Sequence, residues 1–254
     1  MWQEEYLAAA TPEYATAQIA VWWDIEGCQI PEGYDARWVR PSIEGELRKL
    51  GYFGPVSITA YGDHKQTSDD HLRGLSSTGV ALSHTIPEVI YKRMNSDMRD
   101  WRLDNPPPAT IMLISDHVEF LFAKGLVHVQ QGDKYNLFLA YSFRPYKMSI
   151  LVTSAEWLWE SLLAVSETRR HVLRKCSERS ESTGMFYCNV CFCDCQSSGD
   201  YRMHLSSDEH KQQEACIISV IRSNDQDKEY WLRKTVEKEQ TFEESSSDGS
   251  WSSS

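Results

Sequence analysis

Four residues in the last third of the chain have the types and spacing of a zinc site. Two residues separate Cys188 from Cys191, twelve separate Cys191 from His204, and five separate His204 from His210. A Cys-x2-Cys turn supplies two thiolates and a helix supplies two imidazoles, which together make the tetrahedral ligand set of zinc. Apolar residues that can pack around the metal flank the ligands: Phe186, Tyr187, Tyr201 and Leu205. The spacing predicts a small ββα zinc finger over residues 186–216 that folds on binding its metal.

A second group of candidate ligands consists of acids that directly follow apolar runs. Asp24, Asp63 and Asp116 each come after a run of strand length. In open α/β sheets, ligands bind at the carboxyl ends of the strands, where such side chains meet. Carboxylates there can hold magnesium or manganese, and two such ions can activate water against a phosphodiester. A single acid at a strand end is also a common turn or cap residue, so each position alone decides nothing.

The elements that must position these acids alternate between strands and helices. Apolar runs predict strands over residues 19–23, 56–61, 80–83, 110–115 and 136–141. Helical spacing predicts helices over 37–50, 69–75 and 90–101, another beginning at 119–125, and a closing helix over 155–165. Strands of this kind alternating with helices predict βαβ units and a parallel sheet covered on both faces. We therefore expect one α/β domain over residues 18–165.

The rest of the chain is polar, and its charge limits the classes of partner. We expect a flexible lead-in over 1–17, a basic linker over 166–185, and an acidic tail over 217–254 that is disordered from about 240, with a short helix at 228–239. A net charge of −11 argues against a general polyanion binder. Residues 186–216 hold two basic and five acidic side chains, so we expect the finger mainly to contact protein, or to position RNA by shape.

The location predicted from the sequence is intracellular, in the nucleus or the cytoplasm. The longest apolar runs are far too short to span a membrane, and the first residues lack the basic and apolar regions of a secretory signal. Four of the seven cysteines fall within eight residues, which in a reducing compartment indicates metal binding rather than disulfides. We therefore expect no membrane partner.

A resemblance to the NYN domain of plant limkain-type proteins runs through five segments: VWWDIEGCQIP, GYFGPVSITAYGD, LSSTGVALSH, SDMRDWRLDNPPPATIMLIS and SAEWLWESLL. It covers about residues 18–165 and implies a PIN-like, three-layer fold around a parallel sheet. It also implies a metal-dependent endoribonuclease that uses magnesium or manganese in RNA-mediated regulation of gene expression. Some relatives are linked to peroxisomes, but the C-terminus here has no peroxisomal signal.

The cysteine-rich segment resembles a second family. FYCNVCFCDCQSSGDYRMHLSSDEHKQQ is similar to matrin or U1-type Cys-Cys-His-His fingers, which have a third cysteine at the position of Cys195. Such fingers often bind double-stranded RNA or proteins, and several plant NYN proteins carry one. The resemblance therefore implies RNA as a partner, and protein partners through the finger and the tail.

The NYN resemblance transfers residue by residue, and several acids of the pattern are replaced. Asp24 matches the first-strand aspartate, but Gly27 stands where the pattern Asp-Ile-Glu-Asn-Cys has asparagine, and Tyr91 stands at the helix aspartate. The fourth-strand pattern Ile-Ser-Gly-Asp-x-Asp-Phe corresponds to residues 114–120. There Asp116 occupies the glycine position, while His117 and Glu119 replace the two aspartates.

Three functions follow from these matches and departures. The first is an endoribonuclease with Asp24, Asp116 and Glu119 as catalytic residues and with Asp63, Asp97 and His117 as further metal-binding groups. A tyrosine is no ligand for a hard cation at neutral pH, so the substitutions favour impaired catalysis. The second is a degenerate NYN domain that binds RNA or protein without cutting. The third is an adaptor that uses exposed tryptophans and the finger.

Overall fold

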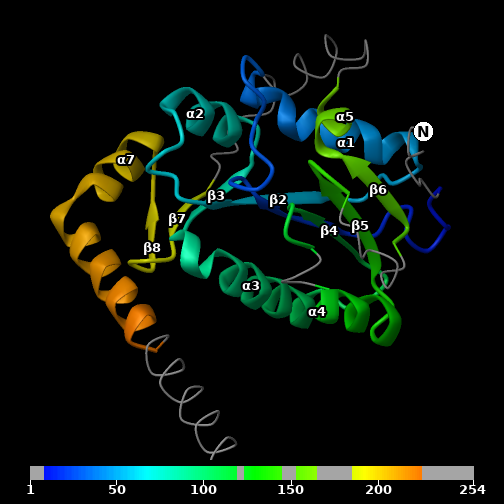
Figure 1. Cartoon of the computed structure of the whole chain (residues 1–254). Helices are drawn as coiled ribbons and strands as arrows, with labels where there is room; N and C mark the ends of the chain where they lie inside the picture. The colour runs from blue at the N-terminus through cyan, green and yellow to red at the C-terminus, as the bar shows by residue number, and fades with distance from the viewer. Residues whose placement is uncertain (1–8, 119–122, 145–152, 165–184, 225–254) are drawn as a thin grey trace, which may run out of the picture. The chain divides into compact units, whose positions relative to one another are not determined.

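The chain forms two compact units in the computed structural model, Met1–Ser207 and Asp208–Ser254. The structure describes residues 9–118, 123–144, 153–164 and 185–224 (Figure 1). The first unit contains the sheet and its helices. In the second unit the described residues form a helix over 208–224. Most of the predicted linker, the predicted tail helix and Glu119 lie outside the described residues.

An eight-stranded sheet forms the centre of the first unit, in the order β6-β5-β4-β1-β2-β3-β7-β8. All neighbouring strands run parallel except the pair β7 and β8. The strands are β1 (Ile19–Asp24), β2 (Val56–Gly62), β3 (Ala81–His84), β4 (Thr110–Ile114), β5 (Asn136–Tyr141), β6 (Ala155–Leu158), β7 (Phe186–Cys188) and β8 (Cys193–Cys195). The predicted α/β class with a central, mostly parallel sheet is therefore confirmed.

Helices lie on both faces of this sheet, which gives the three layers seen in Figure 1. Their bounds are α1 (Val39–Lys49), α2 (Asp69–Ser77), α3 (Ile90–Asp104), α4 (Ala123–Val127), α5 (Trp159–Leu163) and α7 (Ser198–Ser206). Helices α1, α2 and α5 are on one side of the sheet, and α3 and α4 are on the other. Local signals set the ends: Ser68 caps α2 by accepting a hydrogen bond from the amide of His71, and the prolines after Asn105 prevent α3 from continuing.

Two adjacent tryptophans of β1 show how the strand is buried on both faces. Trp22 packs edge-on against Trp101 of α3, with ring centroids 5.4 Å apart. Trp23 packs against Trp159 of α5 on the opposite face, at 5.2 Å. Trp22, Trp23 and Trp159 are all at most 4% exposed. These tryptophans are core residues, so they do not supply the exposed surface that the adaptor hypothesis needs.

The closing helix predicted over 155–165 was wrong in its first half. Ala155–Leu158 forms strand β6 instead, paired with β5 in parallel register, and only Trp159–Leu163 is helical. The apolar run is compatible with a helix or a strand. The strand is favoured because the peptide groups at the edge of β5 need hydrogen-bond partners, which β6 supplies. Glu156 is held there by hydrogen bonds from Tyr141 and Thr153.

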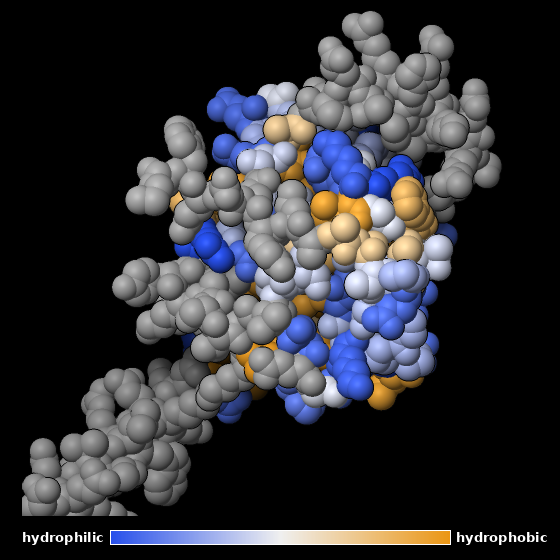
Figure 2. Space-filling view, turned by 90° about the vertical axis from the view of Figure 1, so that its right-hand side faces the viewer, coloured by the Kyte–Doolittle hydropathy of each residue, from blue (hydrophilic) through white to orange (hydrophobic). Residues whose placement is uncertain are grey.

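The surface on the β6 side of the molecule is mixed in character. Figure 2 shows that polar and apolar residues alternate over the described part of this face, with the apolar ones in small groups. Among the residues that the structure describes, no helix combines the length and the apolar character that a membrane crossing requires.

Candidate carboxylate site and metal centre

Asp24 ends β1 and is fully buried. Its Oδ1 accepts hydrogen bonds from the backbone amides of Glu26 (3.1 Å) and Gly27 (2.9 Å). Its Oδ2 accepts hydrogen bonds from the hydroxyls of Tyr91 (3.2 Å) and Ser115 (2.9 Å). Both oxygens are therefore already satisfied by protein donors, which is how a buried carboxylate is kept stable without a metal.

Two of the residues that depart from the family pattern create this arrangement. A Cβ atom on Gly27 would lie 2.6 Å from Asp24 Oδ2, so the carboxylate occupies space that any larger residue would need. Tyr91 extends its hydroxyl from α3 to the same oxygen. Burial, and next the charge of Asp24, raise the pKa of Tyr91, so its hydroxyl stays protonated and donates. Tyr91 therefore stands where the pattern expects an acid and binds Asp24 directly.

Asp116 follows β4 at the neighbouring strand end, with its carboxylate turned to the loop around Ser142. Its Oδ1 accepts a hydrogen bond from the Ser142 amide (2.5 Å) and lies 3.6 Å from the thiol of Cys28. Burial raises the pKa of Cys28, which remains a neutral thiol. His117 is exposed, and its ring packs against Tyr91 with centroids 5.3 Å apart. Glu119, the third predicted catalytic residue, lies outside the described residues.

Asp63 and Asp97, the two aspartates predicted as further metal-binding groups, make separate interactions. Asp63 follows β2, accepts a hydrogen bond from the Lys65 amide (3.1 Å) and lies 3.7 Å from both the Lys65 ammonium and His84. Asp97, on α3, accepts a hydrogen bond from the Tyr61 hydroxyl (2.8 Å) and forms an ion pair with Arg93 (2.8 Å).

Glu26 is an acid at this rim that the sequence analysis did not single out. It borders a hollow of about 660 Å³ together with Asp63, Gln66 and His71. Its Oε1 accepts a hydrogen bond from the Asp63 amide (2.6 Å), and loss of water around the carboxyl raises its pKa. Its position two residues after β1 was the available signal, because residues just past a parallel strand line this edge.

A hard divalent cation does not fit the carboxylates that the structure describes. Such an ion needs several oxygens converging at about 2–2.6 Å. Within the described ranges no three of these acids bring their oxygens together, and the group that does converge is made of cysteines and histidines. Asp24 and Asp116 already accept hydrogen bonds, and Asp97 is in an ion pair. No reaction step through magnesium or manganese follows from this geometry.

The cysteine and histidine group has the convergence that the carboxylates lack. The ligand atoms of Cys188, Cys191, His204 and His210 all lie within 4.8 Å of one another. Strands β7 and β8 form the hairpin, and α7 follows, capped by Ser197. Burial raises the pKa of the Cys188 thiol to about 12, so a thiolate there requires the positive charge that a metal supplies. Two thiols and two imidazoles at this spacing fit a metal ion.

The hairpin is also joined to the larger sheet. Strand β7 pairs with β3 in parallel register, from Leu82 opposite Phe186 to His84 opposite Cys188. The amide of Asn189 donates to Ser83 Oγ and to the His84 carbonyl oxygen. The predicted finger therefore supplies the last two strands of the sheet that holds Asp24.

Arg202 of α7 forms a second connection to the sheet domain. Its guanidinium donates to the carbonyl oxygens of His64 (3.3 Å), Lys65 (3.1 Å) and Thr67, and it pairs with the carboxylate of Asp69 (2.8 Å). The loop that it holds, residues 63–68, lines the hollow beside Glu26. Spacing and composition gave no signal for this contact, since a lone arginine on a helix is usually solvated.

Comparison with known proteins agrees with this architecture. The sequence matches the NYN domain family over residues 18–156. None of the curated proteins with which the chain was compared matches it significantly.

Proposed function

The chain belongs to the NYN domain family, and from this premise we propose that it binds RNA and that its metal-dependent cleavage is impaired. Family membership supports a nuclease or RNA-binding role. One observation supports impaired cleavage: the Tyr91 hydroxyl donates a hydrogen bond to Asp24 Oδ2. A neutral donor there takes the position from which a second carboxylate would share a metal with Asp24.

In this proposal Asp24 has a structural role. Its four hydrogen bonds join the loop after β1 to α3 and to the end of β4. The rim that results is acidic, with Glu26 and Asp63 at its surface. RNA binding is therefore expected to depend weakly on salt, because few phosphate contacts to Lys or Arg are available at this edge.

The test of this proposal compares the native chain with a restored variant, in which four of the five departures from the family pattern are reversed and Glu119 is kept. The restored variant carries Gly27→Asn, Tyr91→Asp, Asp116→Gly and His117→Asp. Both are incubated with a single-stranded RNA and manganese, each beside its own Asp24→Asn control. We expect the native chain to cut no faster than its control. We expect the restored variant to cut at least about a hundredfold faster than its control, the low end of what a positioned catalytic group contributes.

The outcomes separate the two functions. Cleavage by the native chain that Asp24→Asn abolishes would show an active endoribonuclease and contradict the proposal. Absence of RNA binding in a gel-shift assay of the native chain would contradict the RNA-binding part. Circular dichroism of the restored variant shows whether its four substitutions leave the fold intact.

We further propose that Cys188, Cys191, His204 and His210 bind a zinc ion, because two thiolates and two imidazoles in a small ββα unit are typical of structural zinc. Elemental analysis of the purified chain is expected to give one zinc per chain. Contact with protein partners through this region stays a prediction, consistent with Phe192 and Met203, which are 68% and 67% exposed. A role in RNA-mediated gene regulation, in nucleus or cytoplasm, also stays a prediction.

A further inference from the structure

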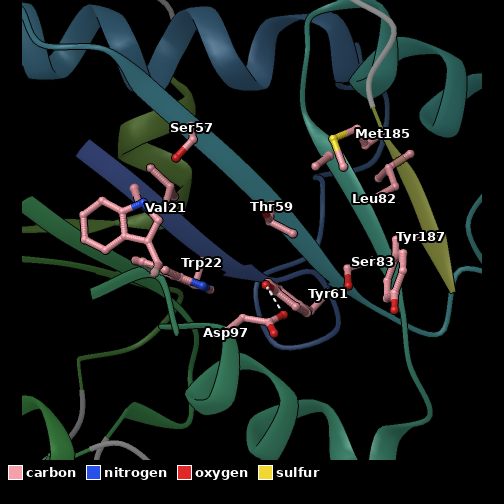
Figure 3. A pocket seen from close by; sticks show the side chains of 13 residues that line it. Val21, Trp22, Ser57, Thr59, Tyr61, Leu82, Ser83, Asp97, Met185 and Tyr187 are labelled. Atoms are coloured by element: carbon pink, nitrogen blue, oxygen red, sulfur yellow. Dashed lines mark hydrogen bonds between the residues drawn. The ribbon is translucent and has the colours of Figure 1, made fainter. Parts of the chain in front are cut away.

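A groove of about 250 Å³ lies between α3 and strands β2, β3 and β7. Thr59 and Ser83 lie on its floor, Asp97 of α3 is on one side, and Tyr187 of β7 is on the other (Figure 3). Trp101 of α3 also lines the groove. Because β7 belongs to the cysteine and histidine hairpin, the groove is built jointly by the NYN sheet and by the metal-binding region. It is lined by none of the residues around the Glu26 hollow.

Strand register places this groove on the same sheet face as Asp24. Asp24 is opposite Tyr61, Tyr61 is opposite Ser83, and Ser83 is opposite Tyr187. Residues in register on neighbouring strands point to the same face, so these four form one row across the sheet. With strands about 4.8 Å apart, Tyr187 is three strand spacings, or about 14 Å, from Asp24. A polymer crossing the Asp24 rim can therefore also enter the groove.

The chemistry of the lining favours a planar group with a polar edge. The partly exposed rings of Trp101 and Tyr187 offer apolar faces. The carboxylate of Asp97 and the hydroxyls of Thr59 and Ser83 offer acceptors and donors to an edge. Aromatic rings beside a polar group are the usual means by which proteins hold unstacked bases of single-stranded nucleic acid.

Other small ligands match this lining less well. Among the described residues that line the groove there is one acid and no Lys, Arg or His. A phosphate would therefore meet the carboxylate of Asp97 and no cationic side chain in the lining, and a divalent cation would find a single carboxylate. The volume is below the roughly 300–1,000 Å³ of pockets that enclose drug-sized ligands, which leaves room for about one base.

We propose that this groove binds one base of single-stranded RNA, with the base stacked on Tyr187 and its amino or imino edge facing Asp97. The inference rests on the proposed RNA-binding function and names the site where the strand is held. Arg93, whose guanidinium is 6.0 Å from the centre of the Tyr187 ring and which pairs with Asp97, keeps both groups in place at the rim.

The test measures binding of fluorescein-labelled eight-nucleotide oligo(A) and oligo(C) to the full chain by anisotropy. Tyr187→Leu removes the stacking ring and is expected to weaken binding at least about fivefold, since stacking is a large part of single-strand affinity. Tyr187→Phe keeps the ring and should stay within about twofold of the native chain by the same principle. Phe192→Leu is the matched control, because Phe192 is an exposed aromatic residue of the same hairpin that does not line the groove.

A second readout separates stacking from a general loss of structure. The salt dependence of binding should be the same in the native chain and in Tyr187→Leu, because stacking releases no counterions. Ultraviolet cross-linking of the bound RNA should label the peptide that contains Tyr187 in the native chain. Unequal salt slopes, or a peptide elsewhere carrying the cross-link, would overturn the groove as a base site.

The remaining outcomes tell the groove and the proposed function apart. Equal RNA affinity of the native chain and Tyr187→Leu would refute the groove while leaving RNA binding intact. If the native chain binds neither oligonucleotide, RNA binding and the groove both fail. A dimer seen by light scattering that Tyr187→Leu dissociates would show that a second copy of the chain occupies the groove, and would also overturn the proposal.

Discussion

The carboxylate rim and the cysteine and histidine group are both candidate metal sites in one sheet, yet among the described residues only the second brings its ligand atoms together. The ligand atoms of Cys188, Cys191, His204 and His210 lie within 4.8 Å of one another, whereas Asp24 is satisfied by four protein donors. The difference arises from where the ligands sit in the sequence. Three ligands lie on the hairpin and α7, and His210 follows four residues after the end of α7, so segments close in the sequence bring the four together. Acids on separate strands depend on each neighbour, and here Gly27 and Tyr91 turn Asp24 inward.

The largest expected effect comes from removing the metal from the cysteine and histidine group. Cys191→Ser, or chelation of the native chain, should unfold the hairpin, because structural zinc supplies on the order of 10 kcal/mol to such small units. Since β7 pairs with β3, hydrogen exchange should also rise at Leu82–His84. Cys216→Ser is the matched control, because Cys216 is exposed and outside the ligand set. Unchanged exchange in β3 would show that the two regions are independent.

The second effect is a pH dependence of the free energy of unfolding that comes from His64, a buried residue in the loop contacted by Arg202 of α7. Burial lowers the pKa of His64 to about 4 from 6.5, and its ring nitrogens lie 3.1 Å from the Ala60 carbonyl oxygen and 3.2 Å from Thr67 Oγ1. The charged group that acts on it is Arg202, which also lowers the pKa, while Nδ1 of His84 accepts a hydrogen bond from the His64 backbone amide. The folded state therefore disfavours the protonated ring.

The sign and size of that dependence follow from linkage. Between pH 6.5 and 4 the unfolded chain binds more protons at His64 than the folded chain does. The contribution of the neutral ring to the free energy of unfolding is therefore complete above pH 6.5 and is lost as the pH falls through about 4. The free energy of unfolding should change by about 3 kcal/mol in all, the value that corresponds to a pKa lowered from 6.5 to about 4. Urea unfolding at several pH values should show this slope, and it should flatten in His64→Gln. A slope that persists in His64→Gln would assign it to other groups.

The third effect tests the contact between α7 and the loop over 63–68. Arg202→Gln removes the ion pair with Asp69 and most of the donors to the loop carbonyls, at a cost of about 2 kcal/mol for charged hydrogen bonds of this kind. Exchange of the amides in this loop should rise, while the metal content should stay at one per chain. Arg222→Gln, on the helix over 208–224, is a matched control because Arg222 lies outside these contacts. Loss of metal from Arg202→Gln would contradict the assigned role.

How far the sequence could predict the molecule depends on how local each feature is. The buried strands Ile19–Asp24 and Thr110–Ile114 and the Cys-x2-Cys spacing are contiguous patterns, and the sheet and the converging ligands were predictable from them. The pairing of β7 with β3 joins segments about 100 residues apart, and no periodicity encodes it. The hydrogen bond from Tyr91 to Asp24 depends on a side-chain direction that residue type alone does not fix.

The smallest expected effect is a change in the free energy of unfolding on substitution of Gly27, beside Asp24 in the carboxylate rim. The residue has no positive φ, so Gly27→Ala is allowed by the backbone, but its Cβ would meet Asp24 Oδ2 at 2.6 Å. We expect a loss of about 1 kcal/mol, typical of a small overpacking in a site that can shift. In an Asp24→Ala background the carboxylate is gone, so the same change should cost almost nothing, and the two substitutions should couple by about 1 kcal/mol. Additive effects in denaturant unfolding would mean that the lack of a side chain at Gly27 does not set the orientation of the Asp24 carboxylate. The orientation of Asp24 would then depend less on its neighbours than the hydrogen bonds indicate.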